Sequence, residues 1–380
     1  MFIRTSKNLK EIIIFDDNEL ALFPPSAMFA KYEPGLSQLV TLECNIYAHN
    51  NLSAPITLEF LKALSTICAN IRKIDLSFRS SNPSEELITF CSNIIKVQKK
   101  LKILHFSQVL GNTGKLITAL EQKLFLEYLK FFKVDFSTIS PSDIKVLTQC
   151  RNVNSLRFIN CRGMTLEHCA SLLNYPLDNL TDLKLLSGSF DLDIVNFLID
   201  MWGPTLIILY LDRIKTNKLS NTLINRCSKL KSLNVNVRDG DEFLLPFLSQ
   251  SSLIHLTMVS YYTASFSYEL GQHLPTTLKH LELKKYYLAS ESFDKFLKNC
   301  KHLVKLEKLT IGTTSPMLDH YLSLREFIES CNSLKMITFY YRDFFINDME
   351  EEKIKAVIKE ITNLGVHCKY YGYEDRSDDY

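Results

Sequence analysis

The hexapeptide Leu180-Thr-Asp-Leu183-Lys-Leu185 has leucine at its first, fourth and sixth positions. Side chains of an extended chain alternate between two faces, so the third and fifth residues point away from the fourth and sixth. Twelve further hexapeptides follow this apolar spacing, the second of them loosely, and they begin at Leu9, Leu36, Ile71, Leu101, Leu126, Val153, Leu206, Leu230, Leu253, Leu278, Leu306 and Leu334. The recurrence indicates that one short strand is the unit from which the chain is built.

The intervals between these hexapeptides define a repeat. Twelve intervals separate Leu9 from Leu334, which gives a mean period of about 27 residues, inside the range of leucine-rich repeats. Single intervals run from 23 residues (Leu230 to Leu253) to 35 (Leu36 to Ile71), so the repeats are uneven. The sequence therefore predicts an α/β leucine-rich-repeat solenoid of about 13 irregular repeats, with a curved parallel sheet inside and helices outside.

The C-terminal part indicates how the array ends. We expect a helix at about residues 348–363 and a strand near 366–371. The aromatic clusters there, including Phe339-Tyr-Tyr341 and Tyr370-Tyr371-Gly-Tyr373, would hide the last core layer. One leucine-rich-repeat domain is thus expected over residues 1–373, with a C-terminal cap at about 340–373 and an acidic, disordered tail at 374–380.

Composition excludes several function classes. The net charge is +2, from 44 basic and 42 acidic residues, which gives no global attraction to nucleic acid or to an anionic membrane. The sequence has no apolar run of the roughly 18 residues that a membrane helix needs, and its N-terminus does not read as a secretory signal. Ten scattered cysteines without a Cys-x-x-Cys pair are typical of a reducing compartment. We therefore expect a cytoplasmic and/or nuclear protein that binds neither nucleic acid nor membrane.

The cysteines and the absence of catalytic motifs favour a non-enzyme. Cys68, Cys150, Cys227 and Cys331 each lie three residues before a hexapeptide, where a small apolar side chain fits a crowded corner of the core. Cys161 lies eight residues after Val153, a position where such repeats use cysteine or asparagine to tie the turn. The spacings do not suit a metal site, and the sequence has no glycine-rich phosphate loop and no nucleophile elbow. We expect no catalytic residue, cofactor or metal.

The fifth hexapeptide positions predict a basic row. Lys130, Arg157 and Lys184 should lie side by side on neighbouring strands, although like charges so placed gain nothing for folding. Around them we place Tyr128, Ile208 and Tyr210, which complete the candidate partner-binding residues. One hypothesis is that the row receives an acidic or phosphorylated segment of a protein partner. The other is that it is a solvated face whose charges serve solubility.

A family resemblance adds an expectation about function. Helix-to-strand junctions such as Cys227-Ser-Lys-Leu230-Lys-Ser-Leu233-Asn-Val235 resemble the leucine-rich-repeat portion of F-box proteins. The irregular repeats, rich in lysine and asparagine, are most similar to those of fungal members. In that family an N-terminal F-box binds the adaptor of a cullin-based ubiquitin ligase, and the repeats select the substrate.

Only eight residues precede the first expected strand, so the resemblance covers the repeats and does not extend to an F-box or to adaptor binding. The chain then represents either a truncated member or a repeat-only relative. The resemblance implies a non-catalytic substrate-recognition arm of a ubiquitin ligase receptor. The alternative is a stand-alone scaffold or regulator, for example of a small GTPase, with no ligase link.

Overall fold

The computed structural model divides into two compact units, residues 1–205 and 206–380. The described residues are 9–15, 36–46, 54–78, 83–111, 113–173, 177–186, 190–212, 216–237, 242–260, 265–284, 290–313, 317–341 and 348–372. The expected tail at 374–380 lies outside them, as does part of the expected cap. The expectation of a single domain over 1–373 stays a prediction.

Unit 1 consists of a parallel sheet with α-helices packed against one of its two faces. Its strands pair in chain order: β1 (Glu11–Phe15), β2 (Thr41–Ile46), β3 (Lys73–Phe78), β4 (Ile103–Ser107), β5 (Tyr128–Phe132), β6 (Ser155–Ile159) and β7 (Asp182–Leu186). Its α-helices are α3 (Ala54–Ile67), α4 (Glu85–Val97), α5 (Gly114–Thr118), α6 (Pro141–Ile144), α7 (Leu166–Ala170) and α8 (Leu192–Trp202). Short 3-10 turns are η1 (Leu36–Gln38), η2 (Phe136–Thr138), η3 (Lys145–Gln149) and η4 (Gly203–Thr205).

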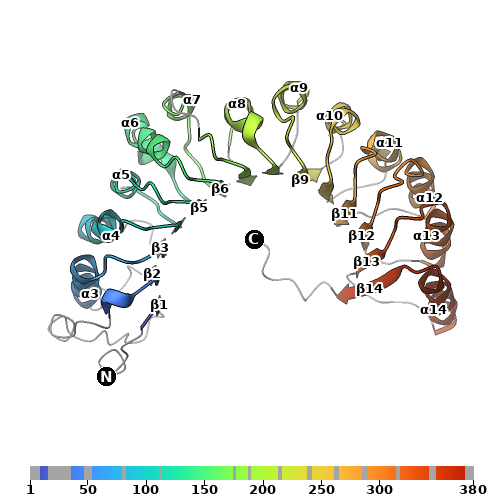
Figure 1. Ribbon diagram of the computed structural model, residues 1–380, viewed down its shortest axis with the longest axis horizontal. Coiled ribbons are helices and arrows are strands. Elements are labelled where there is room, and N and C mark those ends of the chain that lie inside the picture. The colour runs from blue at the N-terminus through green and yellow to red at the C-terminus, as the bar shows by residue number, and fades with distance from the viewer. Residues whose placement is uncertain are drawn as a thin grey trace. The chain divides into compact units, whose positions relative to one another are not determined.

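Unit 2 repeats this arrangement. Its strands are β8 (Ile208–Leu211), β9 (Ser232–Val237), β10 (His255–Ser260), β11 (His280–Lys284), β12 (Lys308–Thr313), β13 (Met336–Tyr341) and β14 (His367–Gly372), again parallel and in chain order. Its helices are α9 (Asn217–Arg226), α10 (Leu244–Gln250), α11 (Ser265–His273), α12 (Ser290–Asn299), α13 (Leu318–Ser330) and α14 (Asp348–Asn363). Within each unit the strands line the inner side and the helices the outer side (Figure 1).

The predicted α/β leucine-rich-repeat architecture is confirmed. In all but one repeat the strand begins two residues after the start of the predicted hexapeptide, and the final helix covers Asp348–Asn363 as expected. The second repeat differs: Leu42 pairs with Ile74 and Cys44 with Leu76, so its hexapeptide begins at Leu39. Residues 36–38 form the turn η1 instead. The loose spacing at Leu36 therefore reflects a wrong register for that repeat.

The sixth hexapeptide positions of β4, β5 and β6 build an aromatic ladder. The rings of Phe106, Phe131 and Phe158 are fully buried and stacked, with centroids 5.6 Å and 5.3 Å apart. Phe136 packs edge-on against Phe131 at 5.4 Å. Such ring pairs add about 0.5–1.5 kcal/mol each beyond burial. The ladder therefore lies beneath β5 and β6, the strands that carry Lys130 and Arg157.

The corners before the strands are joined by side-chain hydrogen bonds. The thiols of Cys68, Cys150 and Cys331 each donate to a carbonyl of the preceding repeat, over 3.2 Å, 3.7 Å and 3.5 Å. The predicted packing role of these buried cysteines therefore includes a weak hydrogen bond. Cys161 donates to the carbonyl of Phe131 over 3.3 Å, which fits its expected role in tying the turn.

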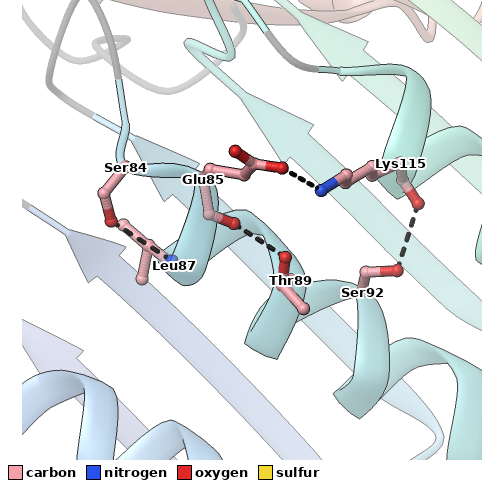
Figure 2. Close-up of polar contacts among 6 residues, drawn as sticks. All are labelled: Ser84, Glu85, Leu87, Thr89, Ser92 and Lys115. Atoms are coloured by element: carbon pink, nitrogen blue, oxygen red, sulfur yellow. Dashed lines mark hydrogen bonds and ion pairs between the residues drawn. The ribbon is translucent and has the colours of Figure 1, made fainter.

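Polar contacts also join neighbouring helices of unit 1 (Figure 2). The Ser84 hydroxyl accepts a hydrogen bond from the Leu87 amide at 3.2 Å and so caps α4. One residue on, Glu85 pairs with Lys115 of α5 at 2.6 Å, and Ser92 donates to the Lys115 carbonyl at 3.1 Å. These contacts fix α4 against α5 on the side away from the sheet.

Candidate functional site

The candidate site lies on the sheet face of unit 1, which we define as the side chains at the third and fifth hexapeptide positions of β1–β7. The strand register places Lys130 opposite Arg157, and Arg157 opposite Lys184. All three side chains are half-buried. The structure thus brings the three predicted cations into one row across β5, β6 and β7.

Arg157, in the middle of this row, is held by two neighbours. Its guanidinium lies over the Tyr128 ring, with Cζ 5.0 Å from the ring centroid. Its Nη2 donates to Asp182 Oδ2 over 3.2 Å. Stacking and ion pairing together fix the plane of the guanidinium. Arg157 is therefore a positioned cation and not a mobile surface charge.

Asp182 was missed by the sequence analysis, which considered only the fifth positions as a charged row. It occupies the third position of β7, diagonally across from Arg157, and its Oδ2 also accepts a 2.8 Å hydrogen bond from Ser155. Its side chain is only 16% exposed, so the negative charge is confined to this cluster. The row is accordingly less positive than its three cations indicate.

Toward β3 the network continues through aromatic rings. The rings of His105 and Tyr128 have centroids 5.1 Å apart, and His105 Nδ1 lies 2.9 Å from Asp75 Oδ2. Burial raises the pKa of the Tyr128 phenol; the Arg157 guanidinium opposes this rise, and the carboxylates of Asp182 and Asp75 add to it. The phenol therefore stays protonated at neutral pH and can donate a hydrogen bond to a ligand.

We call the connected residues the central polar network: Asp75, His105, Tyr128, Ser155, Arg157 and Asp182. Lys130 lies beside it, with Nζ 5.7 Å from the Phe132 ring centroid. Among the residues that the structure describes, no carboxylate lies within 4.0 Å of Lys130 Nζ. Lys130 is thus a cation of this face whose charge a carboxylate or phosphate from outside could balance.

Ile208 and Tyr210 lie on β8 in unit 2, half-buried and on the exposed side of that strand. They are two residues apart, so they share one face of β8. The structure therefore divides the predicted set: the row and Tyr128 belong to unit 1, and the other two candidates to unit 2.

The sheet face of unit 2, defined by the same positions of β8–β14, has a different chemistry. His255 and His280 stand opposite each other on β10 and β11, with ring centroids 4.3 Å apart. Burial, the charge of His255 and the charge of Lys308 lower the pKa of His280. Glu282 lies 3.4 Å from Lys284 and 3.5 Å from Lys308. Burial would raise the pKa of Glu282, but the two lysines lower it overall.

Two other features, a metal site and a membrane-spanning helix, are not found among the described residues. There, no three histidine, cysteine, aspartate or glutamate side chains gather as a metal ion would need. Likewise, none of the described helices combines the length and the apolar character that crossing a bilayer requires. The chemistry on the sheet faces is that of oriented cations, carboxylates and aromatic rings.

Comparison with known proteins gives structural matches at low sequence identity. No family model matches the chain, and no curated protein matches it. It is similar to the crystal structure of the leucine-rich repeat-containing protein LegL7 from Legionella pneumophila, at 14% identity and a TM-score of 0.38, over 93% of this chain and 97% of that one. It is also similar to the crystal structure of a TLR13–ssRNA13 complex, at 12% identity and a TM-score of 0.44, over 89% of this chain and 57% of that one. The assignment of the architecture rests on the chain's own repeats and strand register.

Proposed function

We propose that the chain is a non-catalytic, protein-binding repeat domain whose unit 1 sheet face receives an acidic or phosphorylated segment of a partner. The observation that carries the proposal is the position of Lys130 beside the Arg157–Tyr128 pair. Tyrosine and arginine, with tryptophan, are enriched among the energetically dominant contacts of protein interfaces. Here both are fixed in place before a partner arrives, which lowers the entropic cost of binding.

The chemistry of recognition follows from the hydrogen bonds that the network leaves open. Arg157 uses Nη2 for Asp182, and its Nη1 donates no hydrogen bond within the described residues. A carboxylate or phosphate above β5 and β6 could therefore bond to Arg157 Nη1 and Lys130 Nζ together, with the Tyr128 phenol as a third donor. Such charge-assisted bonds are about twice as strong as neutral ones.

The resemblance to F-box repeat proteins supports a role as the substrate-recognition arm of a ubiquitin ligase receptor. The alternative is a stand-alone scaffold or regulator, for example of a small GTPase. The two roles differ in one observable property. A ligase receptor co-purifies with a cullin adaptor when its natural full-length form is captured, and a scaffold does not.

The test compares partner recovery by three forms of the tagged full chain. Affinity capture and mass spectrometry are applied to wild type, to Lys130→Glu with Lys184→Glu, and to Lys295→Glu with Lys298→Glu. Arg157 is left intact because it holds Asp182 in place. The control pair carries the same charge change on α12, where both lysines form exposed i,i+4 ion pairs that contribute little to stability.

We expect the sheet-face variant to lose a partner that wild type and the α12 variant both retain. The lost partner should contain an acidic or phosphorylated segment, and phosphatase treatment or stronger salt should weaken its recovery. Equal recovery by all three forms would contradict the proposal.

A further inference from the structure

A second surface of unit 1 lies away from the sheet face, at the corner that leads into β5. Residues 119–126 make two successive turns there: the Leu124 amide donates to the Gln122 carbonyl over 2.9 Å and the Leu126 amide to the Lys123 carbonyl over 3.1 Å. This double turn pushes a large apolar side chain outward, and Leu124 is 55% exposed. Neither burial nor the central polar network accounts for its position.

The same corner recurs in unit 2, before β12. The Val304 amide donates to the His302 carbonyl over 2.9 Å and the Leu306 amide to the Leu303 carbonyl over 3.1 Å. Val304 takes the place of Leu124 and is 64% exposed. The chain thus provides a matched position at which the same substitution can be made without touching unit 1.

Leu124 borders a groove of about 710 Å³ between this corner and the segment formed by α6 and η3. Its lining includes Leu124, Lys145, Val146, Thr148, Gln149 and Arg151. A volume of this size falls within the range of small-ligand sites and accommodates several side chains. Leu124 and Val146 form the apolar part of the lining.

The charges of the groove indicate the chemistry of its occupant. The lining contains Lys145 and Arg151 and no carboxylate, and both cations are exposed. Over the described ranges, neither has a carboxylate within 4.0 Å. Thr148 and Gln149 each form a hydrogen bond within the protein: Thr148 donates to the Lys145 carbonyl over 2.7 Å, and Gln149 Oε1 accepts from the Gln122 amide over 3.3 Å. The Gln149 side-chain nitrogen remains as a donor for a peptide carbonyl.

We propose that this groove binds an extended segment of a protein partner in which an apolar side chain lies between acidic residues. The apolar side chain packs against Leu124 and Val146, and the acidic residues pair with Lys145 and Arg151. The site is separate from the unit 1 sheet face, so it adds to the proposed function without depending on it. A partner could engage the two surfaces independently.

The experiment selects binders from a displayed library of random peptides of about twelve residues, long enough for an extended recognition segment, on the immobilised full chain. The most enriched peptide is synthesised with a fluorescent label, and its binding is measured by anisotropy. We expect acidic residues on both sides of an apolar one. Leu124→Asp and Arg151→Glu should each weaken binding by about tenfold or more, the loss of one favourable contact.

Three controls separate this site from others. Val304→Asp should change affinity by less than about twofold, within the range of a neutral exposed substitution. Lys130→Glu with Lys184→Glu should also leave affinity unchanged, because those residues belong to the sheet face. Salt raised from about 50 to about 500 mM should weaken binding through screening. The buried Trp202 reports that each variant keeps unit 1 folded.

The proposal is overturned if the library yields no peptide that Leu124→Asp weakens. It is equally overturned if binding withstands both Arg151→Glu and salt, or if only the sheet-face variant abolishes it. Lys145→Glu, at an exposed position on the same rim, serves as a second charge variant should Arg151→Glu alter the melting of unit 1.

Discussion

The two units are built from the same repeat but differ at the sixth hexapeptide position, directly under the sheet. In unit 1 the middle strands carry Phe106, Phe131 and Phe158, which stack as a buried ladder. In unit 2 the corresponding residues are mostly aliphatic, such as Val235, Met258 and Leu283, and they are equally buried. Both choices fill the core. The aromatic one adds stacked ring contacts beneath the candidate site of unit 1.

The exposed faces differ in the same regions. On unit 1, Arg157 stacks on Tyr128 and pairs with Asp182 of the next strand, while Lys130 keeps its charge available. On unit 2, Glu282 pairs with Lys284 of its own strand and with Lys308 of the next. Around β5–β7, unit 1 thus presents fixed donors to a ligand, whereas in unit 2 the carboxylate of Glu282 is shared between two lysines. The scaffold is shared, and the third and fifth positions distinguish its two halves.

The aromatic ladder should give the largest difference in stability between the two units. Phe131→Ala should lower the free energy of unfolding by about 3–5 kcal/mol, since it opens a cavity and removes two ring stacks. Met258→Ala, the same truncation at the matching position of unit 2, should cost less, toward the lower end of about 2–5 kcal/mol, because it opens a smaller cavity and removes no ring stack. The cost of Phe131→Ala is measured by denaturant unfolding. It is followed by the fluorescence of Trp202, which is the single tryptophan and belongs to unit 1. Far-UV circular dichroism covers both units. Equal costs for the two variants would refute a special role for the ladder.

A smaller loss of stability is expected when the central polar network is broken. Asp182→Ala leaves Arg157 and Ser155 without their acceptor. We expect a loss of about 1–2 kcal/mol, well below the cost of breaking a fully buried pair, because the Arg157 side chain is 29% exposed. For comparison in unit 2, Asp212→Ala, just after β8, removes one 2.7 Å hydrogen bond from Asn236 and should cost about 1 kcal/mol or less. Denaturant curves of both variants, read by tryptophan fluorescence and circular dichroism, test the order. A costlier Asp212→Ala would reverse the assignment of the tighter network to unit 1.

The smallest expected effect is the pH dependence of stability that His280 of unit 2 contributes. The pKa of His280 in the folded chain is lowered from its ordinary 6.5, so the unfolded chain binds more protons between the two values. Stability contributed by His280 is therefore complete above pH 6.5 and is lost as the pH falls toward the lowered pKa. The groups facing His280 are His255, Lys308, Glu307 and Glu282. Thermal melts at pH 7.5 and pH 5.5 should show a smaller acid shift in His280→Gln than in wild type. An identical shift in both would exclude this histidine as a source of acid sensitivity.

The strands and the row could be predicted because apolar spacing records which side chains are buried. That information places Lys130, Arg157 and Lys184 on adjacent strands without any knowledge of rotamers. The diagonal pairing of Arg157 with Asp182 could not be derived in this way, since it depends on side-chain direction across two strands. A reading of the third positions together with the fifth would have placed Asp182 near the row.

Corners were harder to predict than strands. Gln98 and Lys123 occupy the position that cysteine takes in other repeats, and both are buried. Gln98 donates to the Cys68 carbonyl over 2.6 Å, and Lys123 Nζ donates to the Lys96 carbonyl over 2.7 Å. Burial lowers the pKa of Lys123. Polarity alone would place both residues in solvent, because the carbonyls that they satisfy come from the preceding repeat.

Lysine footprinting of the complex shows whether a bound partner covers Lys130 and Lys184 on the sheet face of unit 1. The partner recovered with the wild-type chain is added, exposed amines are acetylated for a short time, and mass spectrometry compares modification rates with and without the partner. We expect Lys130 and Lys184 to be protected, whereas Lys284 and Lys308, which pair with Glu282 in unit 2, react as before. Unchanged rates at Lys130 and Lys184, with protection on unit 2 instead, would contradict the proposed function.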